Sequence, residues 1–140
     1  MRIQLAFLLI VVALAGIFDR DVWTPDEPRV AAVAVQMQRT GDYVVPRLGA
    51  EPFVEEPPLY YAVAGAFAGV LGPVAGDTGA IRLTSALWAL ATLVATFLLA
   101  RCFLRDGRAF LAALILGTME GFVVENGHWI RVDSALVFFV

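Results

Sequence analysis

The chain is 140 residues long, 60% hydrophobic and only 16% charged, with a net charge of −3. Soluble domains carry about 25% charged residues, so this chain has too few charges for a fully water-facing surface. The acidic balance argues against a nucleic-acid-binding protein, and a single cysteine excludes an intrachain disulfide. We therefore predict an all-α integral membrane protein, which will contact membrane lipids and no nucleic acid.

The first apolar segment, about residues 3–18, follows Arg2 and predicts a membrane helix. It also has the length of a signal-peptide core, and Ala13-Leu14-Ala15 provides a small-residue cleavage pattern. This leaves open a secreted protein with a cleaved leader. Because further long apolar segments follow, we favour an uncleaved first span.

A loop of about residues 19–80 follows. Val30, Val33 and Met37 recur on one face between about residues 27 and 39, which predicts a helix lying on the membrane surface. The glycine-rich apolar block of about residues 59–73 is ambiguous between a second interfacial helix and a membrane span.

Two more spans are expected at about residues 81–100 and 109–124, and a fourth begins at about 134–140. A span needs about 20 residues, so we expect the sequence to end inside this fourth span, as a fragment would. The arginine-rich connector 101–108 lies on the same side of the membrane as Arg2 only if block 59–73 stays in the membrane interface and does not cross the bilayer. The positive-inside rule favours that arrangement, which places residues 19–80 and 125–133 together on the external face.

Asp26 and Glu27 lie at the start of the first predicted surface helix. Their ordinary role is helix capping, worth about 1 kcal/mol, together with a favourable interaction with the helix dipole. A carboxylate held at a membrane surface is also a candidate general base. Both residues are therefore candidate catalytic groups.

Glu55 and Glu56 precede Pro57-Pro58, which restrict the backbone on either side. Solvated loop charges are the ordinary interpretation of such a pair. Stiffly held oxygen ligands beside a membrane also suit a divalent metal cation that binds phosphate.

A third polar group, which includes Arg131 and Asp133, lies between two apolar segments, where any loop needs polar residues. Arg131 is nevertheless a candidate phosphate ligand, with Asp133 as an acid beside it. Arg82, near the outer end of its predicted span, is a second candidate for phosphate binding. The alternative is that its side chain only extends along the span so that the charged group reaches the membrane interface.

Five motifs in this order resemble the N-terminal part of GT-C-fold membrane glycosyltransferases, in particular lipid A aminoarabinose transferases and protein O-mannosyltransferase-like enzymes. They are WTPDEPR (23–29), GDYVVP (41–46), EEPPLYY (55–61), RLTSAL (82–87) and RVD (131–133). The resemblance implies the N-terminal part of a GT-C transmembrane helix bundle with an external loop carrying interfacial helices.

The same resemblance implies an enzyme that moves a hexosyl or pentosyl group from a polyprenyl-phosphate-linked sugar donor. The acceptor would be lipid A, another glycan or a protein. The location would be the external, periplasmic face of the bacterial inner membrane, in a multi-pass protein whose 140-residue fragment alone is inactive.

Residue by residue, the resemblance assigns Asp26 as the catalytic acid of the first external loop and Asp133 as the second acidic position. It assigns Glu55 as a metal-associated glutamate. Arg82 matches the arginine of an Arg-Leu-Pro-Ser-Ala-like motif, in which Thr84 here replaces proline.

The chain departs from the family pattern at Glu56, where a lysine that contacts the donor phosphate is common. A carboxylate repels phosphate unless a cation lies between them. A non-catalytic membrane protein, such as a transporter subunit or a truncated pseudo-enzyme, is therefore the alternative interpretation of the sequence.

Overall fold

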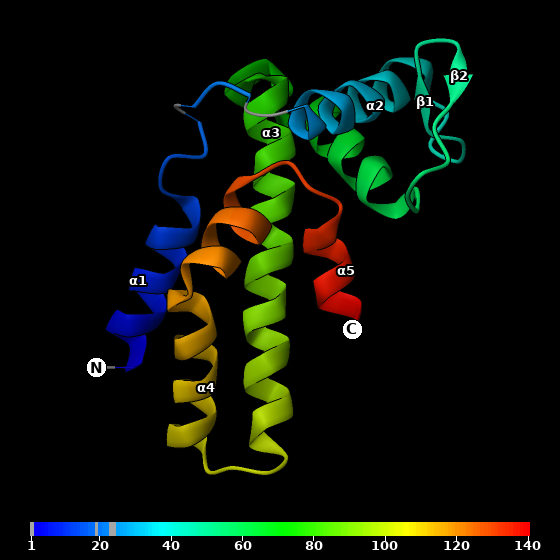
Figure 1. Cartoon of the computed structure of the whole chain (residues 1–140). Coiled ribbons are helices and arrows are strands. Elements are labelled where there is room, and N and C mark those ends of the chain that lie inside the picture. Colours follow the sequence, from blue (N-terminus) through cyan, green and yellow to red (C-terminus); the bar gives the residue numbers. More distant parts are fainter. Residues whose placement is uncertain (1, 19, 23–24) are drawn as a thin grey trace.

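The computed structural model describes residues 2–18, 20–22 and 25–140, so Trp23 and Thr24 of the first motif lie outside the described residues. Most of the described chain is helical, as the composition predicted (Figure 1). In chain order the elements are α1 (Arg2–Leu14), α2 (Asp26–Thr40), β1 (Arg47–Leu48), β2 (Glu51–Pro52), α3 (Leu59–Arg101), α4 (Asp106–Thr118), the π-helix η1 (Phe122–His128) and α5 (Asp133–Phe139).

Helix α3 forms the axis of the molecule and changes direction at Gly76 (φ 72°, ψ 151°). Glycine adopts this positive φ without steric cost, and Pro73 nearby has no backbone N–H to donate to the preceding turn. The first half of α3 lies beside α2, while the second half forms the long column in the centre of Figure 1. The predicted interfacial block 59–73 and the predicted span 81–100 are thus the two halves of one kinked helix.

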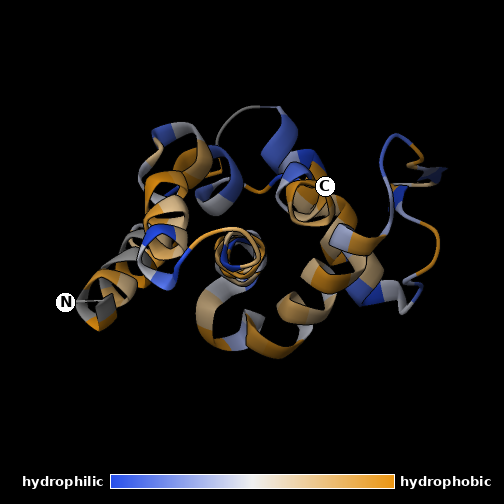
Figure 2. Cartoon of the chain, turned by 90° about the horizontal axis from the view of Figure 1, so that it is seen from below, coloured by the Kyte–Doolittle hydropathy of each residue, from blue (hydrophilic) through white to orange (hydrophobic). Residues whose placement is uncertain are grey.

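The second half of α3, residues 77–101, is about 37 Å long at 1.5 Å per residue, which exceeds the roughly 30 Å of a bilayer hydrocarbon core. Among the described residues, α3 is the one helix both long and apolar enough to cross a membrane; α4 and η1 would supply a second crossing if this bent pair acts as one span. Figure 2 looks along this axis and shows a mostly hydrophobic central helix.

Helix α1 ends at Leu14, earlier than the helix expected over residues 3–18. Gly16 takes a positive φ of 77° and stops the helix. The next residue, Ile17, is fully buried, and the ring of Phe18 lies where a side chain on Gly79 of α3 would be. The end of α1 is therefore anchored to α3 by packing.

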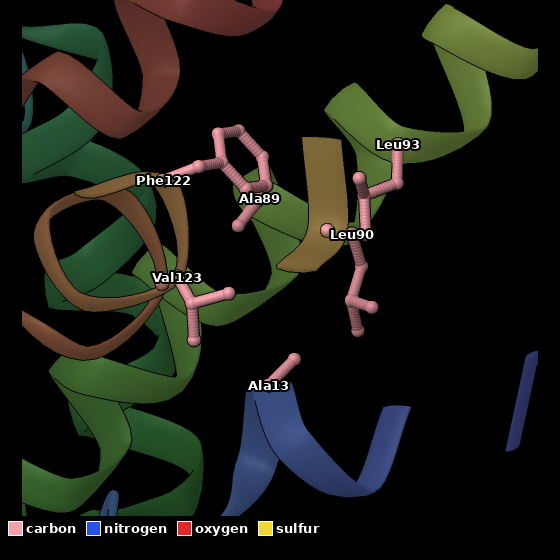
Figure 3. Close-up of a pocket in the computed structure, with 8 residues that line it drawn as sticks. Ala13, Ala89, Leu90, Leu93, Phe122 and Val123 are labelled. Atoms are coloured by element: carbon pink, nitrogen blue, oxygen red, sulfur yellow. The ribbon is translucent and has the colours of Figure 1, made fainter. Parts of the chain in front are cut away.

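The helix expected over residues 109–124 is divided in two. α4 ends at Thr118, Met119 has extended backbone angles (φ −73°, ψ 121°), and η1 leaves at an angle of 76°. The turn packs η1 against α1 and α3, around an apolar cavity of about 10 Å³ (Figure 3). This volume holds at most one water molecule, so the cavity is a packing feature.

Helix α2 covers the predicted surface helix and ends at Thr40, because Gly41 forms a left-handed cap (φ 71°). Pro25 occupies the N-cap position and no side chain caps the helix, so Asp26 is the first helical residue instead of the cap. The apolar face with Val33 and Met37 is buried in a cluster shared with α3. Helices α2 and α3 approach each other closely because Gly65 of α3 has no side chain. A Cβ at this position would lie 2.7 Å from the carbonyl oxygen of Ala34 in α2. The apolar face of α2 therefore packs on protein, although the sequence had indicated packing on lipid.

A short antiparallel hairpin, β1 and β2, follows a bend after α2 in which the N–H groups of Val44 and Val45 donate to Asp42 Oδ1. Its turn uses Gly49 at a φ of 67°. Gln36 of α2 holds this turn, with its amide donating to the carbonyl of Gly49 and accepting from the Gly49 N–H. The sequence predicted no strand in this loop.

Candidate functional site

A buried ion pair joins Arg82 of α3 to Glu27 of α2. Both side chains are only 1% exposed, and Arg82 Nη2 lies 3.4 Å from Glu27 Oε2. The guanidinium of Arg82 also donates to the backbone carbonyls of Ile17, Arg20 and Asp21. Arg82 thereby fixes the path of the segment between α1 and α2 against the start of the long half of α3.

The second oxygen of Glu27 reaches a different part of the chain. Glu27 Oε1 accepts a hydrogen bond from the backbone N–H of Ile130 at 2.9 Å and lies 3.3 Å from Arg20 Nη2. Arg20 in turn donates to the carbonyl of His128 at 3.1 Å. One buried carboxylate therefore connects α2, α3 and the segment that leads into α5.

This connection brings three predicted site residues into one pocket of about 130 Å³. Asp26 lies on one side, next to Glu27 in the chain, while Arg131 and Asp133 follow Ile130 on the other. Val30, Val132 and Glu56 complete the lining. The convergence of Asp26 with Arg131 and Asp133 is the main geometric feature of the site.

The charges around this pocket are held in place by further contacts. Arg131 lies 3.4 Å from Glu125 Oε2, and its guanidinium sits 4.6 Å from the centre of the Trp129 ring. The hydroxyl of Tyr61 donates to Glu56 Oε2 at 2.5 Å. Arg131 is thus the one cationic side chain among the pocket-lining residues, facing three carboxylates.

An apolar groove of about 160 Å³ adjoins the polar pocket. The two hollows share Glu56, Val132 and Asp133. The groove continues between the start of α3 and α5, and its other lining residues are Pro57, Leu59, Tyr60, Ala135, Leu136 and Phe139. A ligand with a polar head and an apolar tail matches this combination of surfaces.

Glu55 lies outside the pocket and is already neutralised. Both of its carboxylate oxygens accept from Arg29 Nη2, at 3.0 and 2.9 Å, on an exposed part of the surface. Within the part of the chain that the structure describes, no group of three or more acidic, histidine or cysteine side chains is placed to hold a metal ion. Glu55 is thus paired with Arg29 in this structure, and a divalent cation at this position stays a prediction.

Glu27 and Arg82, which the sequence suggested as a catalytic acid and a phosphate ligand, both lie in the interior. Neither lines the pocket, and each is occupied by the contacts given above. Arg20 and Tyr61 were not singled out from the sequence, although Tyr61 is the last residue of the EEPPLYY motif and Arg20 lies three residues before WTPDEPR. Their position in or near these motifs was the only signal for them.

In the part of the chain that the structure describes, one helix is long and apolar enough to cross a bilayer, and a polar pocket and an apolar groove lie near one end of it, an arrangement found in helical membrane proteins. No protein-family profile matches the chain, and no solved structure matches it. Curated relatives do match over most of its length.

These relatives are undecaprenyl phosphate-alpha-4-amino-4-deoxy-L-arabinose arabinosyl transferases. The protein from Serratia proteamaculans is 36% identical over 84% of this chain and 21% of its own length. The protein from Yersinia enterocolitica is 35% identical over 82% and 20%, and that from Pseudomonas paraeruginosa is 26% identical over 91% and 23%. The predicted resemblance to membrane glycosyltransferases is thus confirmed, and the chain spans about a fifth of the length of the relatives it matches.

Proposed function

We propose that this chain forms the donor-binding part of a membrane glycosyltransferase that moves a sugar from a polyprenyl-phosphate donor to a lipid, glycan or protein acceptor. The observation that carries the proposal is the pocket shared by Asp26, Arg131 and Asp133, which opens into an apolar groove. The names of the relatives supply the donor class. Lipid A is the acceptor that the resemblance favours.

In the proposed complex the sugar phosphate lies in the polar pocket and the first isoprene units lie in the groove. Arg131 contacts the phosphate, because a guanidinium is suited to bind its oxygens. The repulsion expected from Glu56 is reduced by the hydrogen bond that its carboxylate accepts from Tyr61. Asp133 lies at the junction of the pocket and the groove, where it borders both the head and the tail.

The reaction is a single displacement. An acceptor hydroxyl attacks the anomeric carbon while Asp26 accepts its proton, and the bond between that carbon and the phosphate oxygen breaks. The electron pair leaves with the polyprenyl phosphate, whose growing negative charge Arg131 stabilises. The sugar carbon is inverted in this step.

The pocket is proposed to face the external side of a bacterial inner membrane, in a multi-pass arrangement. The supporting feature is the position of the arginine-rich connector 101–108 at the far end of α3 (Figure 1). Since basic connectors favour the cytoplasmic side, the pocket end of the same helix is assigned to the opposite side.

A binding measurement with the purified chain tests the donor site. Undecaprenyl phosphate is expected to bind more tightly than undecaprenol, and Arg131→Gln is expected to weaken phosphate-lipid binding about tenfold or more, as for loss of a charged hydrogen bond. Arg39→Gln, an exposed arginine near the far end of α2 that does not line the pocket, serves as the control. Equal binding of the two lipids would instead favour a non-catalytic membrane protein.

A further inference from the structure

The connector between α3 and α4 carries positive charge that the candidate site does not use. It contains Arg101, Arg105 and Arg108 and a single acid, Asp106. Arg101 Nε pairs with Asp106 Oδ1 at 2.9 Å, and its guanidinium lies 5.7 Å from the centre of the Phe97 ring. The side chains of Arg105 and Arg108 are exposed and form no hydrogen bond or ion pair with any residue that the structure describes. Two cationic groups in this connector are therefore available to a ligand.

An exposed aromatic side chain lies beside these two arginines. Phe103 is 82% exposed, and it lines a shallow hollow together with Leu104, Gly107 and the two free arginines. Exposing a phenylalanine fully to water is unfavourable. The combination of an apolar ring and unpaired guanidinium groups suits the boundary between acyl chains and phosphates, where long cationic side chains reach out to the polar layer.

The distance along α3 places the connector at such a boundary. Arg82, next to the candidate site, and Arg101 are separated by about 29 Å of helix at 1.5 Å per residue. No charged residue lies between them. This spacing matches the roughly 30 Å thickness of the hydrocarbon core, so an interface at the level of Arg82 puts the connector at the other interface (Figure 1).

We propose that Arg105 and Arg108 bind the phosphate of an anionic phospholipid at the membrane face opposite the candidate site, with Phe103 among the acyl chains. An anionic lipid is favoured over a zwitterionic one because the latter carries an ammonium group that these arginines repel. Basic segments close to a membrane surface attract anionic lipids. This site is independent of the proposed transfer reaction.

The single cysteine of the chain provides a probe at the right place, because Cys102 is exposed in the connector. The purified chain, labelled at Cys102 with a small fluorophore, is placed in phosphatidylcholine vesicles that contain brominated phosphatidylglycerol or, separately, brominated phosphatidylcholine. Both leaflets have the same composition, so the orientation of the protein does not affect the comparison. Brominated phosphatidylglycerol is expected to quench the label at least about threefold more strongly.

The double variant Arg105→Gln/Arg108→Gln is expected to bring this ratio to about one. The matched control Arg39→Gln/Arg47→Gln removes the same charge near the hairpin, away from the connector, and is expected to leave the ratio unchanged. Replacing chloride by inorganic phosphate at equal ionic strength is expected to have no effect. Three results would each overturn the proposal. The first is equal quenching by the two lipids in the unmodified chain, the second is loss of the preference in the control variant, and the third is abolition of the preference by inorganic phosphate.

Discussion

Replacing Glu27 by alanine is expected to lower the free energy of unfolding by about 3–5 kcal/mol, the usual effect of removing one partner from a buried ion pair. The substitution leaves the guanidinium of Arg82 buried without its carboxylate. It also removes the acceptor of the Ile130 N–H. Unfolding of the detergent-solubilised chain by added denaturing detergent, followed by circular dichroism, measures the loss.

The control for this experiment is Glu55→Ala, which removes the exposed ion pair with Arg29. Such an exposed pair contributes less than about 1 kcal/mol to the free energy of unfolding. The double variant Glu27→Met/Arg82→Met is expected to recover part of the loss, since apolar side chains often replace a buried ion pair without a net cost. A stability change for Glu27→Ala no larger than that for Glu55→Ala would show that the buried pair does not hold the fold.

Replacing Asp26 by asparagine is expected to reduce sugar transfer by about 10²–10⁴-fold, the usual contribution of a general base. Asparagine keeps the size of the side chain but does not accept a proton from the acceptor hydroxyl. Asp26 is exposed in the first turn of α2, with no side-chain hydrogen bond to the described residues, so stability is expected to change little. The measurement is the initial rate of transfer of a labelled sugar from undecaprenyl phosphate in membranes that contain the protein.

Asp21→Asn is the matched control, because Asp21 is an exposed aspartate in the segment just before α2 and does not line the pocket. It changes the local charge by the same amount and is expected to leave the rate nearly unchanged. Near-normal turnover in Asp26→Asn would remove this residue from the mechanism. An equal loss in both variants would assign the effect to net charge instead of proton transfer.

Local sequence signals predicted the elements whose limits depend on neighbouring residues. The apolar spacing of Val33 and Met37 predicted α2, and the uninterrupted apolar segment predicted the long half of α3. The positive-inside rule had placed residues 19–80 and 125–133 on one face. In the structure Asp26 lines one pocket with Arg131 and Asp133, while Glu55 lies outside it.

The remaining features depend on contacts between distant residues. Nothing local to Arg82 indicates that it will turn inward onto Glu27, 55 residues earlier in the chain, because a solvent-exposed arginine near a helix end gives the same sequence pattern. The pairing of Glu55 with Arg29 likewise depends on how the loop folds back on α2. The bend between α4 and η1 depends on packing against α1 and α3. Hydrophobic periodicity in the sequence does not indicate such contacts, so the bend was not predicted.

The arrangement of both ends of α3 can be tested by labelling with a membrane-impermeant maleimide in sealed, uniformly oriented vesicles. Single cysteines are placed at Asp26 and at Asp133 in a Cys102→Ser background, and the native Cys102 is labelled in the unmodified chain. We predict that positions 26 and 133 react from one side and Cys102 from the other. Reaction of position 133 from the same side as Cys102, with position 26 reached from the opposite side, would contradict a shared pocket at one membrane face.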